Sequence, residues 1–193
     1  MFQAFDKNLR LHVDLSQQEL EIVHQHFQHK TYPKKTFLLK AGQVCNFEAY
    51  LLKGCIKRYY IDQNGDETIL QFAVEDWWVS DIASFCQQMP SRFYIETMED
   101  TELLQINYQN KELLFKRLPK LERVFRLLVQ RAYAVLENRF FTGITDSAED
   151  RYLQFIKKYP GLLQRVPQYQ IASYLGITPE ALSRIKATLT RKK

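Results

Sequence analysis

The chain has 193 residues, of which 46% are hydrophobic, and its formal net charge is +5. This length suits one large or two small domains, and the composition is sufficient to fill a hydrophobic core. The cysteines, Cys45, Cys55 and Cys86, have no CxxC spacing, which argues against a zinc ribbon or an iron–sulfur cluster. No apolar run is long enough for a signal peptide or a transmembrane helix, so we expect a soluble cytoplasmic protein without membrane contact.

Charge is divided unevenly along the chain. Residues 1–110 contain 10 Lys and Arg against 15 Asp and Glu, whereas residues 111–193 contain 17 against 7. An acidic half joined to a basic half is typical of a phosphate-binding module fused to another domain. Basic residues that merely solvate helix surfaces would give the same asymmetry, so charge alone does not identify the partner.

The first predicted element is a short amphipathic helix over residues 16–29, with Ser16 as its N-cap. Three histidines lie within it, at His24, His26 and His29. Only His26 and His29 share a helical face, and no carboxylate completes a metal site at helical spacing. We therefore predict solvated surface histidines and no bound metal.

The segment that follows is rich in short, alternating, strand-like runs. They cover residues 36–42, 48–61, 67–74, 92–98 and 101–106. Asn64-Gly65 lies between two of these runs and is a strong hairpin signal, because both residues tolerate the positive φ angles of a tight turn. Many short strands separated by turns predict a compact antiparallel barrel or jelly roll, and the flanking helices make the fold α+β.

A barrel of this kind also occurs in cupin-type enzymes. All four histidines of this chain precede the barrel, and the barrel region contains neither a His–carboxylate metal set nor a Ser–His–Asp candidate. We therefore expect no enzymatic activity.

The longest helical pattern begins at Leu114. Apolar residues recur there at alternating steps of four and three, at Leu114, Leu118, Leu121, Phe125, Leu128, Ala132 and Val135. Because proline breaks a helix interior, we predict a short helix before Pro119 and a long one from Pro119 to about Phe141, ended by Gly143. The stripe is typical of a dimer seam, but packing on the chain's own barrel explains it equally well. Further apolar residues widen the face beyond a narrow seam, so we expect both contacts to occur.

A further helix is predicted over residues 146–159, capped by Asp146 or Ser147 and ended by Pro160-Gly161.

The most informative segment is residues 168–187, whose apolar residues fit the core positions of a helix-turn-helix. These are Ile171, Leu175, Ile177, Leu182 and Ile185, with the small Ala172 where two helices must cross closely. Gly176 permits the positive φ angle of the turn. Thr178 then supplies an N-cap and Pro179 the first residue of the second helix. Two helices at a fixed angle let the second enter a DNA major groove, so DNA binding is favoured over an ordinary helical hairpin.

In this order the features resemble the Crp/Fnr family of transcription regulators over nearly the whole chain. The resemblance is carried by the Gly54 turn in YLLKGCIKRYY, the Asn64-Gly65 hairpin, DWWVSDIASF at 76–85, IETMEDTELLQI, Pro119 and IASYLGITPEALSRI. It implies a cyclic-nucleotide-binding-like sensor domain over 1–118, a dimerisation helix over 119–143 and a helix-turn-helix domain without a clear wing over 144–193. It also implies a homodimeric, sequence-specific regulator that binds double-stranded DNA.

The resemblance assigns roles within the helix-turn-helix. Glu180 and Arg184 correspond to the base-reading pair and, being four apart, share one helix face. Arginine can donate two hydrogen bonds to guanine, and glutamate can accept one from cytosine. Phosphate contacts are expected from Gln168, Gln170, Thr178, Ser183 and Lys186. Since no wing follows, its contacts are expected to be absent or to come from the tail, Arg191-Lys192-Lys193.

The sensor region departs from the family pattern at the phosphate cassette. Members that bind cAMP have Gly-Glu and then a strand beginning Arg-Ser/Thr-Ala, whose arginine and backbone amides surround the cyclic phosphate. Here Ser80-Asp81 replaces Gly-Glu, Ser91 stands at the arginine position, and Arg92 lies one residue further, on the opposite strand face. The positions that meet the base fall on Leu136 and Glu137. We therefore predict a degenerate pocket for another small effector, or for none, rather than for cAMP.

Other family members sense oxygen or redox state through an N-terminal cysteine cluster, or gases through haem. No cysteine precedes Cys45, so the sequence predicts no such cluster and no cofactor. An alternative function is a ligand-sensing module that acts through a protein partner, with the helix-turn-helix as a scaffold. Gel-shift assays and their salt dependence separate the two functions, because phosphate contacts produce a steep salt slope.

Overall fold

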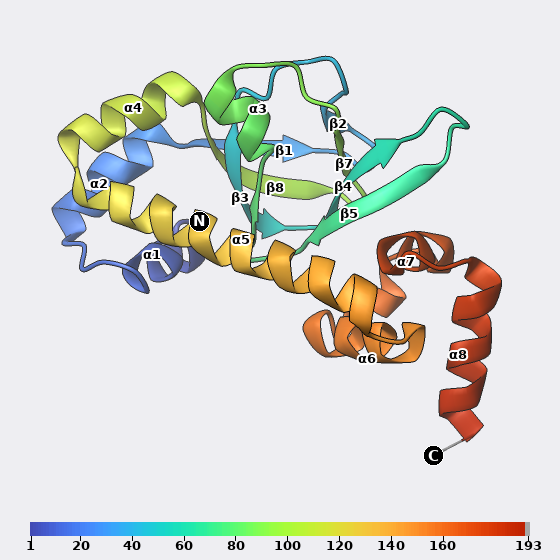
Figure 1. Ribbon diagram of the computed structural model, residues 1–193. Coiled ribbons are helices and arrows are strands. Elements are labelled where there is room, and N and C mark those ends of the chain that lie inside the picture. The colour runs from blue at the N-terminus through green and yellow to red at the C-terminus, as the bar shows by residue number, and fades with distance from the viewer. Residues whose placement is uncertain (192–193) are drawn as a thin grey trace. The chain divides into compact units, whose positions relative to one another are not determined.

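The computed structural model of the chain describes residues 1–191 and divides into two compact units (Figure 1). The first unit contains Met1–Arg58 and Phe72–Ala132, and the second contains Tyr59–Gln71 together with the chain from Tyr133 onward. Lys192 and Lys193, part of the tail considered above, lie outside the described residues. No described helix is long and apolar enough to cross a membrane.

The strands form two four-stranded sheets. The first has the order β1-β8-β3-β6, formed by Gln28–Tyr32 (β1), Thr101–Ile106 (β8), Glu48–Lys53 (β3) and Trp78–Val79 (β6). The second has the order β2-β7-β4-β5, formed by Phe37–Leu39 (β2), Tyr94–Thr97 (β7), Ile56–Ile61 (β4) and Glu67–Ala73 (β5). The pairs β1–β8, β3–β8, β3–β6 and β2–β7 are all antiparallel. The prediction of an antiparallel jelly roll within an α+β fold is confirmed.

A hydrophobic core joins the first sheet to four helices. They are α1 (Gln3–Arg10), α2 (Gln17–His26), α4 (Tyr108–Arg117) and the first part of α5 (Lys120–Thr145). The core side chains include Phe5, Leu9, Leu20, Val23, Tyr50, Leu104, Leu114, Leu121 and Phe125, and each of them is buried. Burial of this apolar surface is the main force that holds the helices on the sheet.

Ser16 caps α2 as predicted. Its Oγ accepts a hydrogen bond from the Glu19 N–H at 3.3 Å, and the Glu19 carboxylate accepts one from the Ser16 N–H at 2.8 Å. The helix ends at His26, earlier than the predicted residue 29, because Phe27 has extended backbone angles and the next residues form β1. Pairing with β8, far away in sequence, overrides the local helical pattern there.

Two turns of the barrel adopt the left-handed backbone that favours glycine. Gly54 joins β3 to β4 with φ +105°, and a Cβ at this position would lie 2.6 Å from Oγ1 of Thr101, so only glycine fits. Gly65 has φ +88° in the predicted turn between β4 and β5. The Asp62 carboxylate accepts hydrogen bonds from two amides of that turn, at 2.8 and 3.0 Å, and so stabilises the hairpin.

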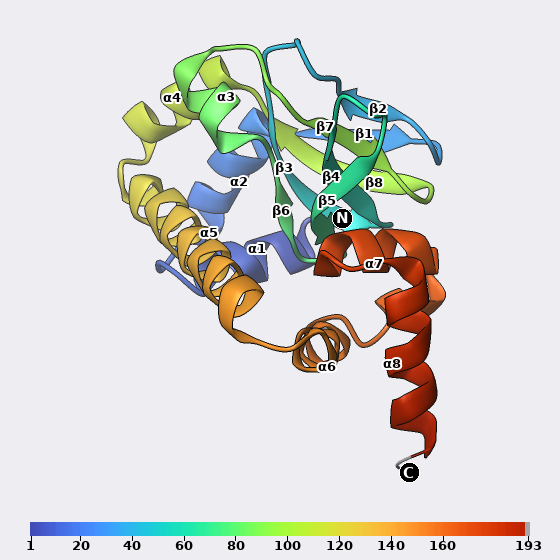
Figure 2. The same cartoon turned by 45° about the vertical axis from the view of Figure 1, so that its right-hand side comes forward.

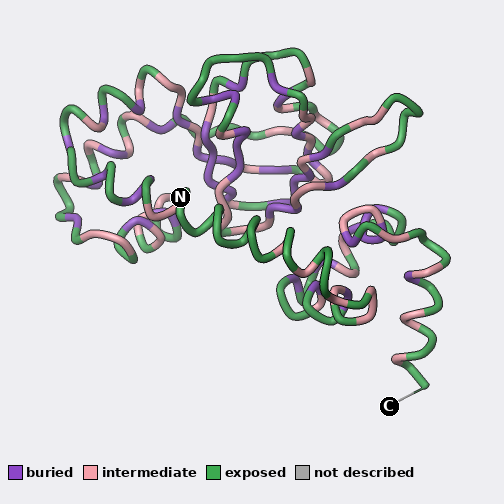
Figure 3. The backbone as a smooth tube through the Cα atoms, viewed as in Figure 1, coloured by how far each residue is buried: buried purple, intermediate pink, exposed green. Residues whose placement is uncertain are grey.

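The apolar stripe predicted as a dimer seam is divided between two environments. Leu114, Leu118, Leu121 and Phe125 are buried in the core of the first unit, so this half of the stripe packs on the chain's own barrel. Of its other predicted members, Leu128 is half-buried, whereas Ala132 and Val135 are exposed. The second half of α5 is mostly exposed (Figure 3). Its exposed large apolar residues also include Phe141 and five that follow one another at helical spacing, Val129, Tyr133, Leu136, Phe140 and Ile144. We call these five residues the exposed stripe.

The prediction that Gly143 ends the long helix was wrong, because α5 continues to Thr145. Gly143 does not have a positive φ angle. A single glycine weakens a helix by only about 1 kcal/mol, which the neighbouring residues of α5 outweigh.

The second unit contains α6 (Ala148–Lys158), a 3-10 turn at Leu162–Gln164, α7 (Gln168–Leu175) and α8 (Pro179–Arg191). Of the two predicted caps for α6, Ser147 is the one used, because its Oγ accepts from the Asp150 N–H at 3.1 Å. The buried side chains of these helices include Tyr152, Phe155, Tyr159, Leu162, Ile171, Leu175 and Leu182. Helix α8 leaves the turn after α7 with most of its residues exposed (Figure 2).

Candidate nucleic-acid interface and sensor cassette

A tight turn joins α7 to α8, as the sequence predicts. Gly176 adopts the left-handed conformation, with φ +68° and ψ +37°. The Ile177 N–H donates to the Ala172 carbonyl at 3.1 Å, which satisfies a carbonyl group at the end of α7. Thr178 caps α8, because its Oγ1 accepts from the Ala181 N–H at 3.2 Å. These local interactions fix the start of α8 relative to the end of α7.

The exposed side of α8 presents Glu180, Ser183 and Arg184. Hydrogen bonds from its own backbone N–H and from the Thr178 hydroxyl lower the pKa of Glu180, and the charge of Arg184 lowers it further. Glu180 is therefore ionised at neutral pH and acts as an acceptor, whereas Arg184 is a permanent donor. One helix face thus carries both kinds of hydrogen-bonding group that the edges of bases require.

The remaining residues predicted to contact DNA fall into two groups. Gln168 is exposed at the start of α7, and its Oε1 accepts a hydrogen bond from Nζ of Lys186 at 3.0 Å, so the structure brings these two together. Gln170 is only 5% exposed, and its Nε2 donates to Oη of Tyr169 at 3.3 Å. Its side chain is therefore not presented to a partner on this surface.

In the cassette, Ser91 and Asp81 are joined by a buried hydrogen bond. Asp81 caps helix α3 (Ile82–Gln87), and its Oδ1 accepts from the Ser84 N–H at 3.4 Å. The Ser91 hydroxyl donates to the other carboxylate oxygen at 2.6 Å. Asp81 is 3% exposed and Ser91 is 5% exposed. The buried carboxylate of Asp81 is thus bound by a neutral hydroxyl and a backbone N–H.

The neighbouring cassette residues are also engaged by the protein. The Ser80 hydroxyl donates to the Phe47 carbonyl at 2.8 Å, and Nη1 of Arg58 donates to the Ser80 carbonyl at 3.1 Å. The Arg58 guanidinium lies over the Phe93 ring, 5.5 Å from its centroid. Arg92 is exposed, but it lies in a bend before β7, so the expected alternation of strand faces does not apply to Ser91 and Arg92.

Leu136 and Glu137, the positions expected to meet a base, lie on the exposed part of α5 in the second unit. Ser80, Asp81, Ser91 and Arg92 belong to the first unit.

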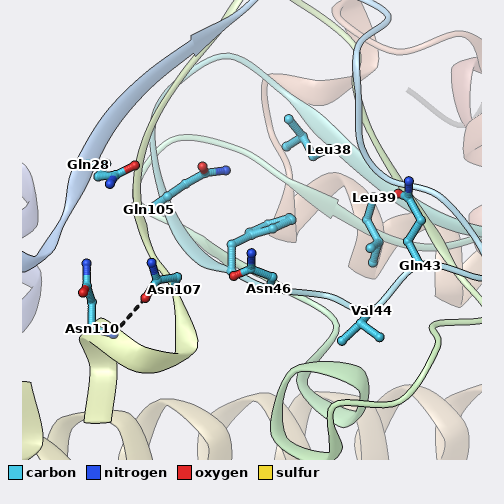
Figure 4. Close-up of a pocket in the computed structure, with 10 residues that line it drawn as sticks. Gln28, Leu38, Leu39, Gln43, Val44, Asn46, Gln105, Asn107 and Asn110 are labelled. Carbon is cyan, nitrogen blue, oxygen red and sulfur yellow. Dashed lines mark hydrogen bonds between the residues drawn. The ribbon is translucent and has the colours of Figure 1, made fainter. Parts of the chain in front are cut away.

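A separate cavity of about 620 Å³ opens on the first unit, and sequence reasoning did not identify it (Figure 4). Six carboxamide side chains line it, together with apolar ones: Gln28, Gln43, Asn46, Gln105, Asn107 and Asn110, with Leu38, Leu39, Val44 and Phe47. Asn107 caps α4, because its Oδ1 accepts from the Asn110 N–H at 2.8 Å. The lining residues share none of the cassette positions, and none of them is charged.

The three histidines predicted on one helix each have a protein partner, but only His24 and His26 lie in α2. His29 lies in β1, so the expectation that all histidines precede the barrel was wrong for this residue. Nε2 of His24 lies 2.7 Å from Oδ1 of Asp6, and Nδ1 of His26 lies 2.8 Å from the Ile22 carbonyl. His29 pairs with Glu102 at 3.4 Å. These contacts tie α1 to α2 and β1 to β8, which is a structural role.

Comparison with known proteins agrees with this architecture. The profile of the cyclic nucleotide-binding domain family matches residues 29–117. The anaerobic regulatory protein of Pasteurella multocida is 26% identical over 189 residues, covering 92% of this chain and 68% of that protein. The anaerobic regulatory protein of Haemophilus influenzae is 27% identical over 183 residues, covering 89% of this chain and 70% of that protein. The global regulator CLP of Xanthomonas campestris has the same fold, with a TM-score of 0.71 at 17% identity, covering 92% of this chain and 93% of that chain.

A cyclic nucleotide-binding domain followed by a helix-turn-helix defines a class of transcription regulators that sense through the barrel. The chain thus contains a cyclic nucleotide-binding domain, and over most of its length it is similar to regulatory proteins, in agreement with its resemblance to the Crp/Fnr family. Both relatives are regulatory proteins, which agrees with the prediction of a transcription regulator rather than an enzyme.

Proposed function

We propose that the protein acts as a homodimer on a pseudo-palindromic site of double-stranded DNA, with one α8 helix in the major groove of each half-site. The observation that carries this proposal is the exposed pair Glu180 and Arg184 on one face of a helix. The start of that helix is fixed by the Gly176 turn and the Thr178 cap. The alternative, in which the helix-turn-helix serves only as a scaffold for a protein partner, gives this charged face no role.

Base reading is assigned to Arg184 and Glu180. The guanidinium fork of Arg184 suits O6 and N7 of guanine, and the Glu180 carboxylate suits N4 of cytosine. Phosphate contacts are assigned to Thr178, Ser183, Gln168 and Lys186, the last two already joined by a hydrogen bond. Gln170 is left out of this interface because its side chain is buried.

Dimerisation is assigned to the exposed stripe of α5. Its aromatic member nearest the helix end, Phe140, is 72% exposed, and large apolar side chains in contiguous exposure are typical of an interaction surface. Helix α5 has 26 residues, so it is about 39 Å long and offers enough length for a helix–helix seam. A twofold pair of such helices would present two α8 helices in the symmetric arrangement that a palindrome requires.

The effector is proposed not to be cAMP. A cyclic phosphate placed against the cassette would meet the buried carboxylate of Asp81 and receive a neutral hydroxyl from Ser91 in place of a cation. Without that cation, the charge of a desolvated phosphate would remain unpaired, which is strongly disfavoured. Titration calorimetry tests this: we expect no heat with cAMP at micromolar concentration, and measurable binding there would overturn this part of the proposal.

Arg184→Ala tests the DNA-binding function. We expect a loss of about 1–3 kcal/mol of sequence discrimination per half-site, because a bidentate contact to guanine is removed. The measurement is fluorescence anisotropy on sites that the wild type selects from random duplexes, compared with scrambled duplexes over a range of salt concentrations. The matched control is Arg117→Ala, which removes an exposed arginine from α4.

Three outcomes are distinct. Loss of affinity for selected sites alone supports base reading by Arg184. Equal loss on selected and scrambled DNA would assign Arg184 to the phosphate backbone. A wild type that binds no duplex, or binds without salt dependence, would overturn DNA binding and favour a protein partner.

A further inference from the structure

Strand β5, helix α5 and helix α7 meet within the second unit through two polar side chains, Arg139 and Ser173. Neither residue belongs to the proposed DNA interface or to the cassette. We call these side chains, with the backbone groups that they bind, the clasp.

Ser173 lies in the last turn of α7 and binds the backbone of β5 in both directions. Its Oγ donates to the Glu67 carbonyl at 2.6 Å and accepts from the Ile69 N–H at 3.0 Å. Strand β5 is at the edge of its sheet, where outward-facing N–H and C=O groups have no neighbouring strand. The serine hydroxyl therefore acts on these groups as an adjacent strand would.

Arg139 reaches from α5 to the same strand and to the end of α7. Its guanidinium donates to the carbonyls of Leu70 and Ile69 on β5, the latter at 3.1 Å, and to the Tyr174 carbonyl at 2.7 Å. The guanidinium also lies 4.0 Å from the centroid of the Tyr174 ring. The planar fork of arginine can bind several acceptors at once, and its charge is favoured at a helix C-terminus.

The clasp connects the β4–β5 hairpin to the proposed recognition helix. Helix α7 is joined to α8 by the Gly176 turn, so fixing the end of α7 also fixes the start of α8. The hairpin itself is ordered locally by Asp62. Within the second unit, the clasp and the Gly176 turn thus connect the hairpin to the start of α8.

We propose that Arg139 and Ser173 are positioning residues that hold the helix-turn-helix on the β4–β5 hairpin and so set the direction of α8. This inference rests on the proposed DNA-binding function and deepens it, because it names the residues that hold the recognition helix in place. Without the clasp, the two α8 helices of a dimer lose the fixed spacing that a two-part DNA site requires.

The role of the clasp is measured by how strongly the dimer distinguishes DNA sites whose two halves lie at different spacings. The duplexes are the full site selected by the wild type, a single half-site, and the full site with about 5 extra base pairs between its halves, which turns one half-site to the opposite side of the DNA. We expect the wild type to bind the lengthened site about 100-fold more weakly than the full site, because a preorganised dimer cannot follow the change. The spacing ratio is the affinity for the full site divided by the affinity for the lengthened site. For the double variant Arg139→Ala, Ser173→Ala we expect a spacing ratio below about 10, with unchanged affinity for the half-site.

Controls separate positioning from loss of structure or charge. Arg123→Ala removes an exposed arginine from the same helix and should keep the wild-type ratio. Ser173→Thr retains the hydroxyl, so in a protein with Arg139 intact it should keep the wild-type ratio of full-site to lengthened-site affinity. Hydrogen exchange gives a readout that needs no DNA: Ser173→Ala should speed exchange of the Ile69 amide by about 10-fold or more, because its acceptor is lost.

The possible results have separate meanings. A double variant that keeps the wild-type spacing ratio overturns the clasp while leaving DNA binding intact. A wild type that selects no DNA site overturns the proposed function and the positioning role with it. Reduced spacing discrimination with a wild-type half-site affinity supports both.

Discussion

At the scale of single residues, the cassette contains a buried carboxylate that is satisfied within the protein. Ser91 donates to Asp81 inside the protein, so the carboxylate that would otherwise need a ligand or water is already bound. Buried polar groups contribute most to stability when both partners are present, and removing one leaves the other unsatisfied. The hydrogen bond between Ser91 and Asp81 thereby stabilises this part of the protein.

Ser91→Ala should destabilise the protein by about 1–3 kcal/mol, because the buried Asp81 carboxylate loses a donor. Urea unfolding followed by circular dichroism measures the change. Arg92→Ala, next to it on the chain but exposed, should shift the free energy of unfolding by no more than about 0.5 kcal/mol. Equal effects of the two substitutions would show that the buried hydrogen bond contributes little.

The three cysteines differ in their accessibility. Burial raises the pKa of the Cys45 thiol, and Cys55 is also buried, whereas Cys86 is exposed. Only a thiolate reacts rapidly with alkylating agents, and it must be reachable. Iodoacetamide at about pH 8 should therefore modify Cys86 in the folded protein and the other two only in denaturant. Mass spectrometry of the alkylated peptides tests this, and modification of Cys45 under native conditions would contradict it.

At the scale of elements, the two glycines Gly176 and Gly143 have opposite roles. Gly176 has φ +68° and forms the turn of the helix-turn-helix, whereas Gly143 lies inside α5 without a positive φ. A Cβ at either position would find no atom within 4 Å, so backbone conformation alone distinguishes them. The turn between α7 and α8 thus depends on a conformation that other residues rarely adopt.

Gly176→Ala should destabilise the second unit by about 1–2 kcal/mol, because a left-handed backbone is penalised by a side chain. Gly143→Ala should instead stabilise the protein by about 0.5–1 kcal/mol, because alanine is the better helix former. Thermal unfolding of the two variants provides the comparison. If both changes destabilise, space rather than backbone conformation governs these sites.

At the scale of the whole molecule, the proposed dimer depends on the exposed stripe of α5. The residues of that stripe gain nothing from the chain's own core, since the core uses the earlier part of the same helix. A second copy would bury them, and burial of large aromatic and aliphatic side chains contributes about 1.5–3 kcal/mol each. Symmetric pairing is the common solution for such a surface.

Phe140→Glu should shift the protein toward the monomer in sedimentation velocity, because a charge would be buried in the seam. Asn138→Glu introduces the same charge on the same helix. At about 100° per residue it lies on the opposite face and should leave the dimer intact. Weaker binding of full DNA sites should accompany monomer formation. A Phe140→Glu protein that remains a dimer would place the interface elsewhere.

The local features of this protein could be read from its sequence. The Gly176 turn, the Thr178 cap, the Ser16 capping box and the Asn64-Gly65 hairpin each depend on a few neighbouring residues. Their chemistry, a positive φ angle or an unpaired helix N–H, is the same in any fold. The order of these features was sufficient to predict a jelly roll followed by a helix-turn-helix.

Tertiary structure decided what those features contact. The sequence could not show that Gln170 is buried beside exposed neighbours, or that the Ser91 hydroxyl donates a hydrogen bond to Asp81. It also could not divide the α5 stripe between core and surface, or bring Ser173 to the edge of β5. Each of these contacts joins residues whose side chains carry no local preference for one another. Their partners are selected only when distant elements pack, because burial and unpaired backbone groups are properties of the assembled fold.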